Sequence, residues 1–161
     1  MPIVAAIGLV LASMSACSEP SSPSEDAAFE ALSDEGWAYG DTLHFPISDE
    51  VADSLGSARM ALCVRHSDAY LYSNLWLEVS TPVAGTDSMR VDTVNVALAD
   101  VYGKWYGKGV GVSFIKTDTL HGRYEFDKRR PASVRHIMRL DTLRDLEQIG
   151  LVFFDLKSDS I

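Results

Sequence analysis

Met60-Ala-Leu-Cys-Val-Arg65 is the stretch that decides the fold, because its bulky apolar side chains recur at every second position. A period of two is that of an extended strand, in which successive side chains point to opposite faces of a sheet. Met60, Leu62 and Val64 would then face a core, while Cys63 and Arg65 would lie on the other face. The stretch therefore predicts a half-buried β-strand.

The same alternation continues through the rest of the chain beyond Asp41, with turn residues about every ten positions. Threonine, valine and aromatic residues are frequent in these runs, and no repeat of fixed period interrupts them. About eight short strands predict an all-β fold, an antiparallel β-sandwich for which jelly-roll connections are one possible topology. The expected strands are 43–47, 60–65, 75–79, 94–98, 110–114, 120–126, 134–140 and 150–156.

Helix is expected only in two short pieces. Residues 27–32 are predicted to form a turn or two. Asp141 is a suitable N-cap for a helical turn over 142–148 that Gly150 would close. The polar run Thr117-Asp118-Thr119 is expected to be a turn between two strands.

The N-terminus has the pattern of an export signal. Ile3–Ala12 is an uncharged apolar run of ten residues, whereas a helix needs about 20 to cross a bilayer. Small residues stand immediately before Cys17, as in the lipobox of bacterial lipoproteins. We predict a signal peptide over 1–16, a lipid on Cys17, an acidic tether over 17–36 and one sandwich domain over 37–161. A buried strand or helix is the alternative for the apolar start.

The formal charge of −9 belongs mainly to the tether. Residues 18–35 carry six acids and no base, while residues 36–161 carry 17 acids and 14 bases, a difference of −3. Proteins that bind nucleic acid need a basic face to displace counterions from phosphates. The sequence therefore excludes a nucleic-acid partner and predicts attachment to a membrane through the lipid.

Candidate catalytic and metal-binding patterns are weak. His66-Ser67-Asp68 places three triad residue types side by side, but a triad is assembled from distant positions, so adjacency does not provide its geometry. The four histidines share no metal-binding spacing. If Cys17 carries a lipid, Cys63 has no partner for an intramolecular disulfide and is expected to be an ordinary strand cysteine. We expect no enzyme activity, no metal and no cofactor.

Two loops invite a binding interpretation. The glycine-rich segment Gly103–Gly111 contains Trp105 and Tyr106, which would either cap the sandwich or form an aromatic platform for sugar or peptide. Lys128-Arg129-Arg130 is the one concentrated basic run. It would be either a solvated loop or a contact with an acidic partner or with lipid head groups.

Val64-Arg-His-Ser-Asp-Ala-Tyr-Leu-Tyr-Ser-Asn-Leu-Trp-Leu77 is the most distinctive segment of the chain. It resembles the signature of the gliding motility lipoprotein GldH family, in which Arg-His precedes a Tyr-x-Tyr-x-Asn-Leu-Trp run. Asp92-Thr93, the Gly103–Gly109 loop, Met138-Arg139 and Ile149-Gly-Leu151 follow in the order that family shows. The resemblance spans roughly residues 37 to 155.

The resemblance implies a non-enzymatic envelope lipoprotein, in the outer rather than the inner membrane. It implies that the protein is an accessory or scaffold component of the gliding motility apparatus linked to type IX secretion, whose proteins would be its partners. A carbohydrate- or peptide-binding module is the alternative. The signature either builds a tight connection between strands or forms part of a partner-binding surface. The candidate binding residues are Arg65, His66, Tyr70, Tyr72, Asn74, Trp76, Trp105 and Tyr106.

Overall fold

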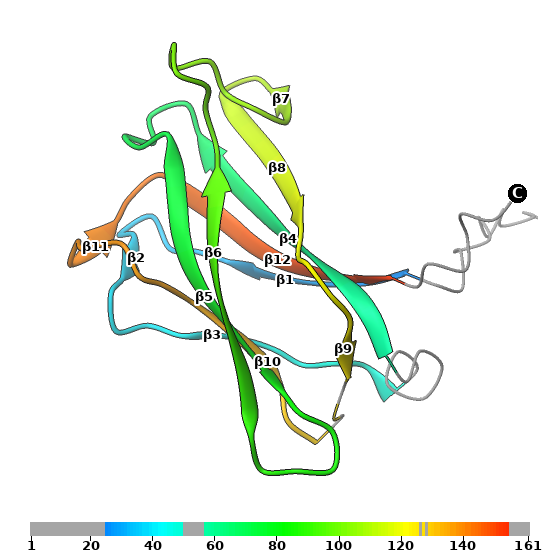
Figure 1. Cartoon of the computed structure of the whole chain (residues 1–161). Coiled ribbons are helices and arrows are strands. Elements are labelled where there is room, and N and C mark those ends of the chain that lie inside the picture. Colours follow the sequence, from blue (N-terminus) through cyan, green and yellow to red (C-terminus); the bar gives the residue numbers. More distant parts are fainter. Residues whose placement is uncertain (1–24, 50–56, 126, 128, 155–161) are drawn as a thin grey trace, which may run out of the picture.

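The computed structural model describes residues 25–49, 57–125, 127 and 129–154. These residues form twelve strands and no helix (Figure 1). None of the described residues belongs to a helix that could cross a membrane. The strands are β1 (Glu25–Ala31), β2 (Trp37–Ala38), β3 (Leu43–Phe45), β4 (Ser57–Ser67), β5 (Asn74–Pro82), β6 (Met89–Ala97), β7 (Lys108–Val110), β8 (Ser113–Thr119), β9 (Tyr124–Glu125), β10 (Ala132–His136), β11 (Thr142–Leu143) and β12 (Leu146–Phe154).

The larger sheet is centred on β4. Its strands follow the order β1-β12-β4-β8-β7, and β9 pairs with the beginning of β4. All of these pairings are antiparallel. Met60, Leu62 and Val64 are fully buried, whereas Arg65 on the opposite face is exposed. The alternation in the sequence therefore predicted the inward face of this strand correctly.

The smaller sheet has the order β3-β10-β5-β6, and it covers the inner face of the larger one. Leu75, Leu77 and Val79 of β5 are fully buried and belong to the same apolar cluster as Met60 and Leu62 of β4. Because the two antiparallel sheets share one core, the expected all-β sandwich is confirmed.

A two-stranded sheet of β2 and β11 closes one side of this core. The indole N–H of Trp37 donates to the carbonyl oxygen of Asp41 at 3.0 Å. The Trp37 ring also meets the buried ring of His136 edge-on, with 5.2 Å between the ring centroids. Trp37 therefore buries its apolar body while keeping a partner for its one polar atom.

Both expected helices are wrong. Residues 25–31 form β1, which pairs along β12 from Glu25 with Phe154 to Ala31 with Gln148. This pairing covers an edge that β12 would otherwise expose. Residues 142–148 form β11 and the start of β12, with Asp145 between them at a φ of 64°, a left-handed conformation that a helix cannot contain.

The strands also differ from the sequence analysis at several places. The expected strand 110–114 contains the turn between β7 and β8, β9 covers only two residues of the expected strand 120–126, and β10 ends at His136 rather than at 140. Thr117-Asp118-Thr119 lies inside β8 and pairs with Ala61–Cys63 of β4, so the turn expected there is wrong. Residues 25–31, which the sequence analysis assigned to the tether, are part of the folded sheet. Residues 1–16 and Cys17, for which a signal peptide and a lipid were predicted, lie outside the described residues.

Candidate functional site

Three connections meet at one end of the sandwich, at the top of Figure 1. We call them the loop end: residues 68–73 between β4 and β5, residues 98–107 between β6 and β7, and the turn 111–112 between β7 and β8. The backbone N–H of Asp68 donates to the carbonyl oxygen of Val112 at 2.7 Å. The N–H of Leu98 donates to the carbonyl oxygen of Ser73 at 2.8 Å. The three connections are therefore held against one another.

A cluster of aromatic rings lies beneath the loop end, around the fully buried side chain of His66 in β4. Its ring centroid lies 4.5 Å from that of Trp105 and 5.7 Å from that of Tyr70. The Phe114 ring, at the start of β8, stacks on His66 at 5.8 Å. Because each neighbour belongs to or follows a different connection of the loop end, His66 ties all three together.

Hydrogen bonds fix the orientation of two rings in this cluster. The Nδ1 atom of His66 lies 2.8 Å from the carbonyl oxygen of Ser67. A carbonyl oxygen can only accept, so Nδ1 carries the proton. Burial, reinforced by the neighbouring Tyr72, raises the pKa of Tyr70 far above its ordinary value. Its hydroxyl therefore stays protonated and donates to the carbonyl oxygen of Asn74 at 3.3 Å.

Large apolar side chains project outward from these connections and from the last residue of β7, which adjoins them. They are Leu71, Val101, Tyr102, Val110 and Val112, and they are between 62% and 93% exposed. The Asp100 carboxylate stabilises the conformation of residues 100–104. Its Oδ1 atom accepts hydrogen bonds from the backbone N–H groups of Tyr102 and Lys104, both at 2.9 Å. The loop is thus held by polar contacts, while its apolar side chains face solvent.

The candidate binding residues divide into two groups in the structure. His66, Tyr70, Tyr72 and Trp105 come together beneath the loop end, with Tyr70 and Tyr72 meeting edge-on at 5.6 Å. Tyr70 is buried and Tyr72 and Trp105 are half-buried. These side chains therefore support the loops rather than forming an open aromatic platform.

The remaining candidates lie apart from that cluster. Asn74 donates from Nδ2 to Oδ1 of Asn95 across β5 and β6 at 2.8 Å. Trp76 is exposed on the outer face of the smaller sheet. Arg65 and Tyr106 lie on the outer face of the larger sheet, where each lines a hollow.

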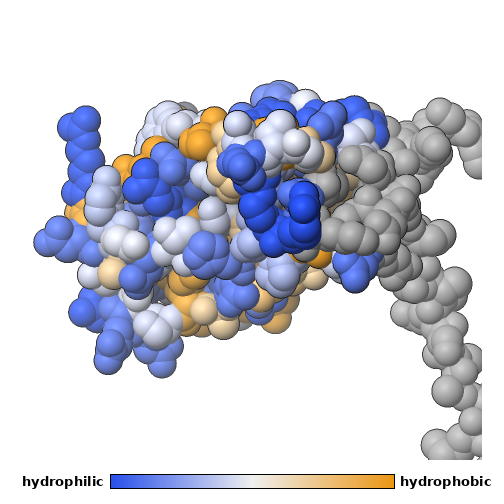
Figure 2. Space-filling model, turned by 90° about the horizontal axis from the view of Figure 1, so that it is seen from below, coloured by the Kyte–Doolittle hydropathy of each residue, from blue (hydrophilic) through white to orange (hydrophobic). Residues whose placement is uncertain are grey.

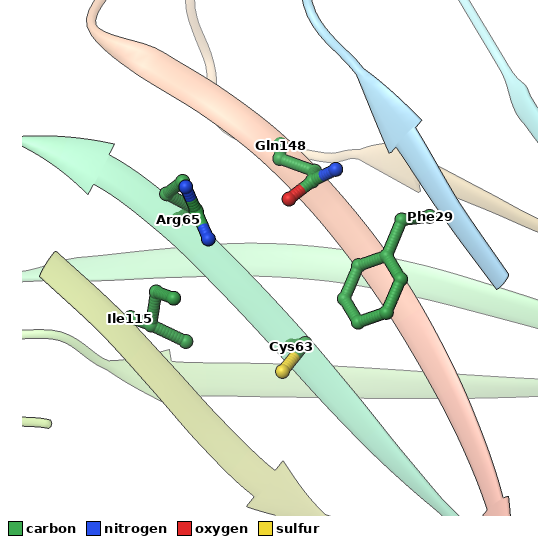
Figure 3. A pocket seen from close by; sticks show the side chains of 5 residues that line it. All are labelled: Phe29, Cys63, Arg65, Ile115 and Gln148. Atoms are coloured by element: carbon green, nitrogen blue, oxygen red, sulfur yellow. The ribbon is translucent and has the colours of Figure 1, made fainter. Parts of the chain in front are cut away.

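The first hollow, of about 220 Å³, is shown in Figure 3. Gly150 of β12 stands between Phe29 of β1 and Cys63 of β4, beside this hollow. The Phe29 ring lies against Gly150, so closely that an added Cβ would overlap the ring. The lining residues come from four neighbouring strands and are Phe29, Cys63, Arg65, Ile115 and Gln148.

The chemistry of this hollow combines an apolar wall with one cation. Phe29 and Ile115 provide the apolar surface, and the Cys63 sulfur lies 3.0 Å from Oγ1 of Thr117. The guanidinium of Arg65 makes no ion pair or hydrogen bond with any described residue. An apolar group carrying a carboxylate matches this arrangement, since guanidinium binds carboxylates through paired hydrogen bonds. Tyr106 lines a wider adjoining hollow that shares Ile115.

The basic run is largely structural. The Arg130 guanidinium donates to the carbonyl oxygens of Val83 at 3.2 Å and Thr86 at 2.6 Å, which form the turn between β5 and β6. Arg129 pairs with the Asp127 carboxylate at 3.2 Å and remains mostly exposed. Lys128 lies outside the described residues. Within the described part of the chain, no cluster of three or more metal-ligating side chains occurs.

Sequence reasoning missed several of these surface residues. Phe29 was assigned to the tether and Gln148 to a helical turn, so neither was considered for a site. Val110 and Val112 were assigned to an expected strand, and Val101 and Tyr102 were not singled out, although Tyr102 stands directly beside a glycine in a connection. Bulky apolar residues inside glycine-rich connections are the signal that could have identified this surface.

The fold and these surfaces define a single all-β sandwich domain with an exposed apolar end and shallow hollows on its outer face. The sequence model described as GldH lipoprotein matches residues 26–152, and the chain belongs to that family. It is therefore a lipoprotein associated with gliding motility, attached to a membrane of the cell envelope. The resemblance noted in Val64–Leu77 is confirmed. Searches of curated proteins and of solved structures found no match.

Proposed function

We propose that the protein is a non-enzymatic, lipid-anchored accessory or scaffold component of the gliding motility apparatus linked to type IX secretion. The observation that carries this proposal is the family match, which covers the sandwich from β1 into β12. The lipid is attached to Cys17, and the anchoring membrane is the outer rather than the inner one. Its partners are other proteins of the gliding and secretion machinery.

The order of segments along the chain supports the anchor. Cys17 follows small residues and an apolar run, and seven residues, 18–24, separate it from the first residue of β1. Serine, proline and acidic residues dominate this interval, a composition that favours a solvated connection. The folded domain would therefore sit close to the membrane surface.

Metabolic labelling with a clickable fatty acid tests the anchor. The wild-type protein and a Cys63→Ala variant should incorporate the label, and a Cys17→Ala variant should not. In fractionated envelopes the labelled protein should follow outer-membrane markers. Deletion of the gene should abolish gliding or reduce secretion of surface adhesins. Unlabelled wild-type protein together with normal motility and secretion in the deletion strain would contradict the proposal.

A carbohydrate- or peptide-binding module is the second candidate, and the hollows on the outer face of the larger sheet favour it. Phe29 and Tyr106 offer rings, and Arg65 offers a guanidinium without a partner among the described residues. A glycan and peptide array should then give binding that Arg65→Gln or Tyr106→Ala abolishes, with Val91→Ser as the matched control. No binding by folded wild-type protein would exclude this candidate.

A further inference from the structure

We infer that the loop end is a docking surface for another protein, one that presents an apolar face of little net charge, on the side of the domain away from the anchoring membrane. This inference rests on the proposed function and names the part of the molecule that meets the machinery. Three observations carry it: how apolar side chains are displayed, which charges surround them, and where the chain enters the domain.

The exposed apolar side chains of the loop end lie close together, and the backbone that carries them is held in place. Single exposed apolar side chains are normal on protein surfaces, but here four large ones project from three adjoining connections and a fifth, Val110, projects from the strand end beside them. The connections are hydrogen-bonded to one another through Asp68 and Leu98, and their base packs on His66. Little conformational freedom remains to be lost on binding, so burial of these side chains would contribute mainly to affinity.

The charges of the loop end do not select a charged partner. Its three connections contain Asp68, Asp100 and Lys104 as their only ionisable residues besides tyrosines. The Asp100 carboxylate is already used to hold its own loop. Asp68 and Lys104 carry opposite charges, so the surface attracts neither a polyanion nor a polycation. Apolar contact is the interaction that this surface offers.

The point at which the chain enters the domain lies at the other end of β4. Glu25 pairs with Phe154, and Phe154 pairs with Arg59 near the start of β4, whereas the loop end follows Ser67. The eight residue steps from Arg59 to Ser67 span about 26 Å of strand. The chain from Cys17 to Glu25 covers at most about 28 Å when fully extended.

These lengths favour a protein over the lipid bilayer as the partner that binds the loop end. The loop end could reach the anchoring membrane only if the whole connecting segment ran back along the length of the domain. In Figure 1 the loop end lies at the top, whereas β1 begins at the right beside the end of β12, so a connecting segment that leads directly to the lipid does not bring the loop end onto it. An apolar surface turned toward the aqueous compartment matches a protein partner.

Photo-crosslinking in cells tests this inference with the full, processed protein. A photoreactive phenylalanine analogue replaces Leu71 or Tyr102 at the loop end, and Val91, which is 55% exposed on β6, is the matched apolar control. We expect positions 71 and 102 to link to the same protein, identified by mass spectrometry, and position 91 not to. Tyr102→Ser should lower the yield from position 71 at least tenfold, whereas Val91→Ser should not change it.

The identified protein, once purified, should bind the wild-type domain and not the Tyr102→Ser variant. Adducts with lipid alone, links only to a second copy of this chain, or equal linking from position 91 would overturn the inference. If deletion of the gene impairs motility but the loop end links to nothing, the inference fails and the proposed function stands. If deletion changes neither motility nor secretion, the proposed function fails whatever the loop end binds.

Discussion

The two ends of the sandwich close in opposite ways. At the loop end, aromatic rings pack around His66 and apolar side chains face outward. The other end, which we call the hairpin end, contains the β5–β6 turn at 83–88 together with residues 121–123 and 129–131. There Arg130 holds the turn through its carbonyl oxygens, and Arg90 lies over the ring of Tyr124 with 4.2 Å between guanidinium carbon and ring centroid. Figure 2, a view from below, shows many hydrophilic side chains with apolar patches between them.

The two ends differ in which of their side chains are already in contact with other parts of the domain. At the hairpin end the arginine groups satisfy turn carbonyls and cover a ring, so the end is stabilised from within. At the loop end the polar groups hold the backbone, and the apolar surface remains available. Burial of such surface is favourable at about 25 cal/mol per Å². Association with a partner is therefore expected at the loop end rather than at the hairpin end.

The largest effect is expected from the base of the loop end. Tyr70→Ala removes a buried ring from the cluster around His66 and should lower the free energy of unfolding by about 4 kcal/mol. The neighbouring Leu71→Ala removes an exposed side chain and should change it by less than about 0.5 kcal/mol. Urea unfolding of the two variants measures both values. Equal losses would contradict the division between supporting and displayed residues.

Two glycines of the loop end form a matched pair for a second test. Gly103 and Gly107 have φ values of 83° and 84°, but only at Gly107 would a Cβ overlap the carbonyl group of Ile115. Gly103→Ala should cost about 1 kcal/mol, the usual penalty for a left-handed residue. Gly107→Ala should cost at least about 2 kcal/mol, because the backbone of β8 must move as well. Thermal unfolding of both variants would show whether the loop is as tightly held as the hydrogen bonds indicate.

The hairpin end should depend on Arg130 and not on Arg129. Arg130→Ala removes the donor of the Thr86 carbonyl and one of the donors to the Val83 carbonyl, and it should cost about 1 to 2 kcal/mol. Arg129→Ala removes a mostly exposed side chain and should change stability by less than about 0.5 kcal/mol. Denaturant midpoints of the two variants give this comparison. An equal effect of both would indicate that the basic run acts through its overall charge.

A fall in pH should lower the free energy of unfolding through His136 in the core, by less than the substitutions above. Burial lowers the pKa of His136 below its ordinary value of 6.5, so the folded protein keeps this ring neutral where the unfolded chain binds a proton. The resulting stability is fully present above pH 6.5 and is lost as the pH falls toward the folded pKa. Unfolding midpoints measured from pH 7.5 to 5 should fall for the wild type and fall less for His136→Phe. Parallel curves would exclude this residue as the cause.

The sequence predicted the sheets better than it predicted their connections. Alternation at every second position gave the buried face of β4 because one face of that strand contacts the core and the other does not. The same rule failed at β1, whose backbone pairs with β12 across more than 100 positions of sequence, and at 142–148, where Asp145 takes a left-handed conformation. Local patterns contain no information about a distant strand edge.

The candidate site was predicted in part. The signature segment pointed to His66 and Tyr70 and the glycine-rich loop pointed to Trp105, and the structure brings these side chains together. Their role beneath the loops could not be predicted, since only the sheet topology places residue 105 beside residue 66. Tyr102 was missed because an apolar residue in a turn gives no periodic signal. Val110 and Val112 were instead assigned to an expected strand over 110–114, so their exposure was not foreseen.

The most direct test of the central claim compares matched variants of the two ends in cells that lack the native gene. Leu71→Ser with Tyr102→Ser changes the loop end, and Met89→Ser with Val91→Ser changes exposed apolar residues of β6 toward the hairpin end. Gliding and adhesin secretion are measured at equal amounts of labelled protein. We predict loss of function for the first pair and normal function for the second. Normal function of the first pair, or equal loss in both, would contradict the claim.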